Sequence, residues 1–169
     1  MSINASASIT CDINFTMVET GESSQSEASA LAYSQSFTNG TGANNIAYGV
    51  LTSGILTSGG SEVINLSGIT KRSFGVDNTI VFAKVRGIVV ENRSTVYGYD
   101  IGIHATGVNA ITDLFNGGSG NLMIKPKSPF IYADPISGLD ITGTSRLFTI
   151  DDIGGSGASW SVIVIGNTG

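Results

Sequence analysis

Thr79-Ile-Val-Phe-Ala-Lys-Val-Arg-Gly-Ile-Val-Val-Glu91 is the stretch that decides the fold, because its apolar residues become consecutive towards its end. A strand that is apolar on both faces belongs between two covering layers. The stretch therefore predicts a central strand in the core of a sheet protein. The whole chain has the same bias, since 20 Ile and 12 Val against 8 Leu favour pleated sheet over helix.

Further short apolar stretches lie on both sides of this run, separated by turns rich in Gly, Asn, Pro and Asp. Asn109–Phe115 fits one or two helical turns, and Pro126 and Pro129 predict that the next strand lies at a sheet edge. The expected strands are Asn45–Val50, continuing through two near-identical pentads with a glycine kink, Glu62–Leu66, Val96–Ile103, Leu122–Lys125, Phe130–Ala133, Gly138–Thr142, Arg146–Ile150 and Ser159–Ile165. This pattern predicts an all-β, antiparallel, jelly-roll-like β-sandwich with few or no helices.

The N-terminal segment alternates strictly between apolar and polar residues. Its apolar positions are Ile3, Ala5, Ala7, Ile9, Cys11, Ile13, Phe15 and Met17. Period-two alternation predicts a half-buried strand, which pairs either within its own chain or with a neighbouring subunit. We expect Ile9, Ile13, Phe15 and Met17 to make assembly-interface or core contacts, and Cys11 to be a buried thiol.

The segment that follows the first strand is ambiguous. Thr20–Gln35 is small and polar with an Ala-rich middle, and it fits a loop, a short helix or another strand. Residues 39–45 are rich in Gly and Asn and predict a turn. The expected organisation is thus residues 1–44 as an arm or the first part of the sandwich, and residues 45–169 as the β-sandwich core.

Charged residues are scarce and unevenly placed. They make up 12% of the chain, the net charge is −5, and the first 70 residues contain no Lys or Arg. A nucleic-acid-binding protein needs clustered basic residues, so we exclude that class. No stretch approaches the ~18 apolar residues of a membrane span. The N-terminus lacks the basic and apolar regions of a secretory signal, so we expect the protein to be made in a cytoplasm.

The order of several segments resembles small β-sandwich structural proteins of tailed-bacteriophage virions, and capsid decoration (cement) proteins in particular. The likeness rests on Asn45–Gly49, Ser61–Ile69, Val81–Asn92, the proline pair near Lys125 and the closing Ser161–Gly166. The resemblance implies a jelly-roll subunit without a catalytic site that forms a homotrimer, binds the major capsid protein or another virion protein, and stabilises the head lattice in the virion. The N-terminal strand and the Ala-Ser segment fit equally well an arm for attachment to a tail fibre or tube.

The residues offer little for catalysis or cofactor binding. His104 is the single histidine and no Gly-x-Ser-x-Gly motif occurs, so a surface or turn role is expected for His104. One Cys and one His do not suffice for a zinc site. Asp151 and Asp152, near Asp134 or Asp140, are the closest approach to a calcium site, but adjacent strand residues face opposite ways, and we interpret them as a solvated, turn-forming pair. We expect no enzyme, no cofactor and no metal.

A carbohydrate- or receptor-binding module of a phage tail or fibre is the alternative function. Trp160, Tyr97, Tyr99 and Tyr132 could form a platform on which sugars stack. A single Trp at the start of the last apolar strand is more typical of the core, and we expect Trp160 to pack there.

Overall fold

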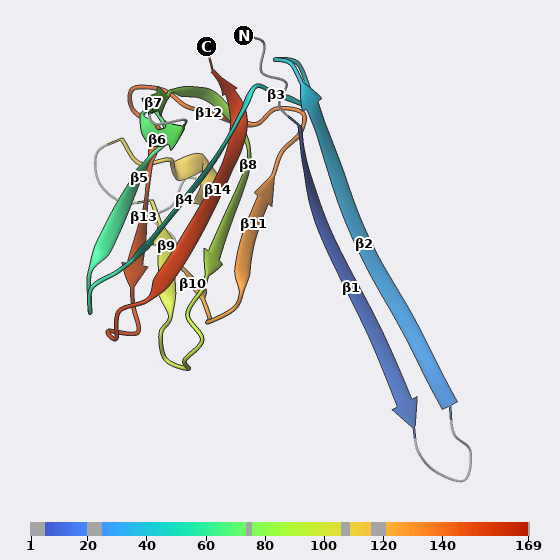
Figure 1. Ribbon diagram of the computed structural model, residues 1–169. Helices are drawn as coiled ribbons and strands as arrows, with labels where there is room; N and C mark the ends of the chain where they lie inside the picture. The colour runs from blue at the N-terminus through green and yellow to red at the C-terminus, as the bar shows by residue number, and fades with distance from the viewer. Residues whose placement is uncertain (1–5, 20–24, 74–75, 106–108, 116–120, 169) are drawn as a thin grey trace.

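The computed structural model describes residues 6–19, 25–73, 76–105, 109–115 and 121–168, of which residues 12–19, 25–31, 71–73, 76, 77 and 112 are described by their backbone alone. Strands dominate these ranges (Figure 1). They are β1 (Ala7–Glu19), β2 (Gln25–Asn39), β3 (Asn45–Ile46), β4 (Tyr48–Ile55), β5 (Ser61–Asn65), β6 (Ile69–Ser73), β7 (Val76–Ile80), β8 (Phe82–Asn92), β9 (Ile101–His104), β10 (Asn121–Ile124), β11 (Pro129–Ala133), β12 (Leu139–Asp140), β13 (Leu147–Asp152) and β14 (Ser159–Thr168). A short 3-10 helix, η1 (Thr112–Phe115), lies where helical turns were expected.

Eight strands, together with the two-residue β12 that pairs with β8, form the two facing sheets of a jelly roll, which we call the body. One sheet has the order β4-β14-β8-β11 and the other β5-β13-β9-β10, with antiparallel pairing throughout. Chain connections such as β4 to β5, β8 to β9 and β13 to β14 pass from one sheet to the other, as in a double Greek key. The prediction of an all-β sandwich is confirmed.

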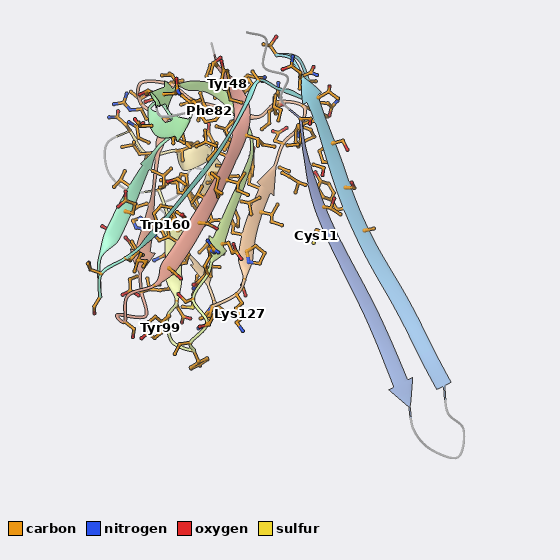
Figure 2. All side chains as sticks on the ribbon, viewed as in Figure 1. Cys11, Tyr48, Phe82, Tyr99, Lys127 and Trp160 are labelled. Atoms are coloured by element: carbon orange, nitrogen blue, oxygen red, sulfur yellow. The ribbon has the colours of Figure 1, made fainter. Side chains whose placement is uncertain are left out.

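The core lies between the two sheets and consists of alternate residues of each strand. Phe82, Ile88 and Val90 of β8 face Phe148 and Ile150 of β13 across it, all at 1% exposure or less. Trp160 also packs in this core (Figure 2), and a Cβ at Gly54 would lie 2.9 Å from its ring. Most of the apolar run, Phe82–Glu91, lies in β8, a central strand between β14 and β11, whereas Thr79 and Ile80 end β7, which pairs with β6.

The first two strands form a long hairpin, which we call the arm. Their register runs from Ala7 opposite Phe37 to Glu19 opposite Gln25. The arm joins the body at one end and then extends away from it (Figure 1). The first strand therefore pairs within its own chain but outside the two sheets of the body, and the ambiguous Thr20–Gln35 segment supplies most of its partner strand, β2.

Two further sequence-based predictions about the fold were wrong. Val96–Ile103 is not one strand: β9 begins only at Ile101, because residues 93–100 form a loop in which Gly98 has a φ of +88°. Cys11 is exposed rather than buried, because the face of the arm that carries it moves away from the body just after Ile9 (Figure 2).

Candidate interaction surface

The base of the arm is fixed to the body by a small apolar cluster, which we call the arm seat. Ile9 and Phe37 of the arm, Ile46 of β3 and Ile165 of β14 are all buried in it, at 8% exposure or less. Gly87 of β8 lies beneath them. A Cβ at Gly87 would lie 2.8 Å from Ile9 Cδ1 and 3.0 Å from Ile165 Cγ1, so the glycine allows the arm to approach the sheet closely.

Hydrogen bonds hold the turn at residues 40–44 that connects the arm to the body. Arg86 of β8 is buried and donates from Nη2 to the Gly42 carbonyl at 3.2 Å, and from Nη1 to the Ile136 carbonyl. Asn167 of β14 donates from Nδ2 to the Thr41 carbonyl at 3.1 Å. Both buried side chains belong to central strands of the body, so the arm leaves from a fixed point rather than from a loose linker.

The loop after β11 completes this attachment. The Asn44 N–H donates to the Pro135 carbonyl at 2.7 Å, and the Asp134 carboxylate accepts the N–H groups of Ile136 and Ser137 at 3.1 and 2.8 Å. Burial opposes ionisation of Asp134, but backbone N–H donors and the nearby Arg86 charge outweigh it and lower its pKa. Burial, with the nearby Asp134 and Asp113 charges and a hydrogen bond to Asp134, raises the pKa of Tyr132 to about 12.

An apolar row crosses the outer face of the β4-β14-β8-β11 sheet next to the arm seat. The register pairs Leu51 with Ile163, Ile163 with Val89, and Val89 with Ile131, one residue from each strand. Leu51 is 54% exposed, Ile163 43% and Ile131 38%. We call these four residues the open row.

The structure places the four predicted interface residues at alternate positions of β1. Ile9 makes a core contact at the arm seat within its own chain. The side chains of Ile13, Phe15 and Met17 lie outside the described part of the structure, and their role at an interface stays a prediction.

Sequence reasoning missed Phe37, Ile46 and Ile165. The available signal was Arg86-Gly87, a charge and a glycine inside an otherwise apolar core strand.

His104 lies on the outer face of the other sheet, where it pairs with Asp151 of the neighbouring strand. The His104 Nε2 and Asp151 Oδ2 atoms are within hydrogen-bonding distance, and both side chains are partly buried. The pair joins β9 to β13 and fits the surface role expected for His104. A histidine and a carboxylate alone do not make a hydrolytic site, which also needs a nucleophile and oxyanion donors.

The four aspartates considered for calcium serve separate purposes. Asp151 pairs with His104, whereas the adjacent Asp152 faces the opposite way and accepts the N–H groups of Gly59 and Gly157 at 2.9 and 2.8 Å. Asp140 Oδ1 forms an ion pair with Lys84 Nζ at 2.5 Å, and the Asp134 carboxylate accepts backbone N–H groups of its own loop. Asp152 does stabilise turns, but it is buried, so the expectation of a solvated pair was wrong for it. Among the described residues, no three His, Cys, Asp or Glu side chains gather as a metal site.

The aromatic residues considered for sugar binding do not form one platform. Trp160 is 4% exposed and packs in the core, as expected. Tyr99 and Tyr132 are half-buried against that core, and Tyr97 is 90% exposed with the Lys125 ammonium 6.0 Å from its ring centroid. Of these four aromatic side chains, Tyr97 is thus the one that is largely exposed to solvent.

Comparisons with known proteins provide no family. No protein-family model matches the sequence, and no curated protein matches it either. Among solved structures, the crystal structure of Yersinia pseudotuberculosis-derived mitogen (YPM) aligns over 70% of this chain and 86% of its own, at 15% identity and a TM-score of 0.35. That likeness is too weak to support any inference. In the described part of the chain, no helix has the length and hydropathy to cross a membrane.

Proposed function

We propose that this chain is a non-enzymatic structural protein that assembles through its β-hairpin arm, as a capsid decoration protein of a tailed-phage virion would. The arm is the observation that carries the proposal. It is fixed at its base by buried residues of β8 and β14 and then leaves the body (Figure 1). Its sequence keeps the apolar alternation beyond that base. An amphipathic strand pair outside its own core calls for a covering partner.

In this function the protein acts by mass action. A partner that binds only the assembled shell lowers the free energy of that state. Each bound copy of the partner stabilises the shell by about 2.7 kcal/mol when the free concentration of the partner is 100 times its dissociation constant. A homotrimer presents three binding sites at once, so weak contacts to the major capsid protein add up. The low charge of the chain suits a surface largely covered by neighbouring subunits.

The first test compares the solution mass of the full chain with that of an arm-trimmed variant. This variant replaces residues 12–32 with an Asn-Gly turn between Cys11 and Tyr33, which face each other in the register. Trimming here retains Ile9 and Phe37, so the arm seat stays filled. We expect light scattering to give three times 17.4 kDa for the full chain and close to one chain mass for the variant.

The same number of subunits in the two proteins would contradict the proposal. A full chain that is folded and monomeric at all concentrations would also contradict it, and would favour the carbohydrate- or receptor-binding alternative. A glycan array with the Tyr97→Ala variant would then be the next measurement, because Tyr97 is the exposed aromatic residue of that set.

A further inference from the structure

One face of the body carries two adjacent apolar rows, and the arm covers only the first. The covered row consists of Gly49, Ile165, Gly87 and Ala133, and the next row in the same register is the open row. Ile9 and Phe37 bury Ile165 to 5% exposure. One step further along the same strand, Ile163 stays 43% exposed.

On the arm, too, burial gives way to exposure directly after the arm seat. Its buried residues Ile9 and Phe37 give way to Cys11, which is exposed, and to the opposite Tyr33, which is 42% exposed. The pleat of a strand sets alternate residues on one face, so Cys11 shares the face of Ile9. Cys11 and Tyr33 on the arm and the open row on the sheet thus follow directly after the residues that meet at the arm seat.

A polar row bounds the open row on its other side. Ser53, Ser161 and Glu91 form it, with Pro129 at its β11 end, and Ser161 Oγ donates to Glu91 Oε2 at 3.0 Å. The open row is therefore a narrow apolar strip between a seated arm and a polar border. Such a strip suits a strand pair that presents an alternating apolar face.

We propose that the open row is the docking site for the arm of a second copy of this chain. The proposal rests on the proposed function and names its partner and its surface. The second copy is the occupant that fits best, because the adjoining row already binds this same arm through Ile9 and Phe37. An arm that leaves its own body and a body that exposes the matching row allow each copy to act as donor and acceptor, the kind of contact that forms a ring of identical subunits when the rotation between copies closes.

The test uses the full chain with lysines placed in the open row. The row-blocked variant is Leu51→Lys with Ile163→Lys, and both positions are exposed enough for the lysine side chains to reach water. Val63→Lys is the matched control, because Val63 is 53% exposed against 54% for Leu51 and lies on β5 of the other sheet. We expect the dissociation constant of assembly to rise at least about tenfold in the row-blocked variant and to stay at the wild-type value in the control.

A mixing experiment gives a positive readout that loss of folding cannot imitate. The arm-trimmed variant keeps the open row but lacks the arm, whereas the row-blocked variant keeps the arm but lacks the row. Each alone is expected to be monomeric, and the mixture is expected to form a one-to-one pair by light scattering. Circular dichroism of each variant checks that its strands are intact.

The possible failures are distinguishable. If the arm-trimmed variant loses assembly but the row-blocked variant assembles like the wild type, the docking site is overturned and the proposed function stands. A mixture that stays monomeric while the wild type assembles overturns the docking site in the same way. If trimming the arm changes nothing, or the wild type never assembles, both proposals fail.

Discussion

At the scale of the single residue, Asn92 connects two loops at one end of the body. Its Nδ2 donates to the Tyr99 and Ile124 carbonyls at 2.7 and 2.9 Å, and its Oδ1 accepts the Ser94 N–H at 3.0 Å. The side chain is fully buried. These three bonds hold the loops that follow β8 and β10 close to each other, although the loops are separated by more than one strand in sequence.

Asn92→Ala is expected to lower the free energy of unfolding by at least about 2 kcal/mol, since each buried group left without a partner costs about 1–3 kcal/mol. Urea unfolding of the wild type and the variant measures this difference. Asn121→Ala is the matched control, because Asn121 is an exposed asparagine on β10, the strand whose Ile124 carbonyl accepts a bond from Asn92. A loss below about 0.5 kcal/mol, the range of ordinary surface substitutions, would show that Asn92 does not stabilise the loops.

At the scale of the element, the loop of residues 134–138 helps to attach the arm to the body, and its contribution to stability depends on pH. Its Asp134 carboxylate holds two backbone N–H groups, and its Pro135 and Ile136 carbonyls accept bonds from Asn44 and Arg86. The pKa of Asp134 is lower in the folded chain than its ordinary value of 3.8. Its ionised form therefore adds stability that is fully present above about pH 4 and is lost as the pH falls through the folded pKa.

Asp134→Asn should flatten this part of the pH profile. We expect the wild type to lose more unfolding free energy than the variant when the pH falls from about 5 to about 3, because the amide keeps the turn bonds but does not titrate. Urea unfolding at several pH values measures both profiles, and the contributions of other carboxylates cancel in the difference. Parallel profiles would contradict the assignment.

The same scale explains which elements could be predicted from the sequence. β8 and β14 were predicted because apolar runs within a sheet identify strands directly. β2 was left open because an Ala- and Ser-rich segment has no strong preference, and its pairing with β1 decides its conformation. Tyr97 and Tyr99 fit the alternating pattern of a strand. However, Gly98 between them has a positive φ and turns the chain, and Tyr97 is exposed.

The candidate surface was predicted only in part, for a related physical reason. Alternation in β1 identified an apolar face that includes Ile9, but alternation does not say what covers that face. The contact of Ile9 with Ile165 joins residues at opposite ends of the sequence, and no local pattern reports it. Cys11 was misassigned for this reason, since its position fits the pattern while the covering layer ends one pair earlier.

At the scale of the whole molecule, the body and the arm differ in how their strands are supported. Core strands such as β8 and β14 pair with a strand on each side and pack one face on the core between the two sheets. In the part of the chain that the structure describes, the arm is a single two-stranded layer beyond its base (Figure 1). A two-stranded hairpin alone is at best marginally stable in water, so the arm depends on its surroundings and the body does not.

Hydrogen exchange should make this difference visible. In the row-blocked variant, which we expect to be monomeric, amides of β1 and β2 beyond the Cys11–Tyr33 pair should exchange at least about a hundredfold faster than those of β8 and β14, because local opening there costs little free energy. In the assembled wild type the arm amides should slow, since a second copy then covers one face, while the β8 and β14 amides stay unchanged. Val63→Lys is the control and should follow the wild type. Slow exchange of the arm in a monomeric variant would mean that the arm is stable without a partner, and the apolar alternation that continues beyond Ile9 would then need a different explanation.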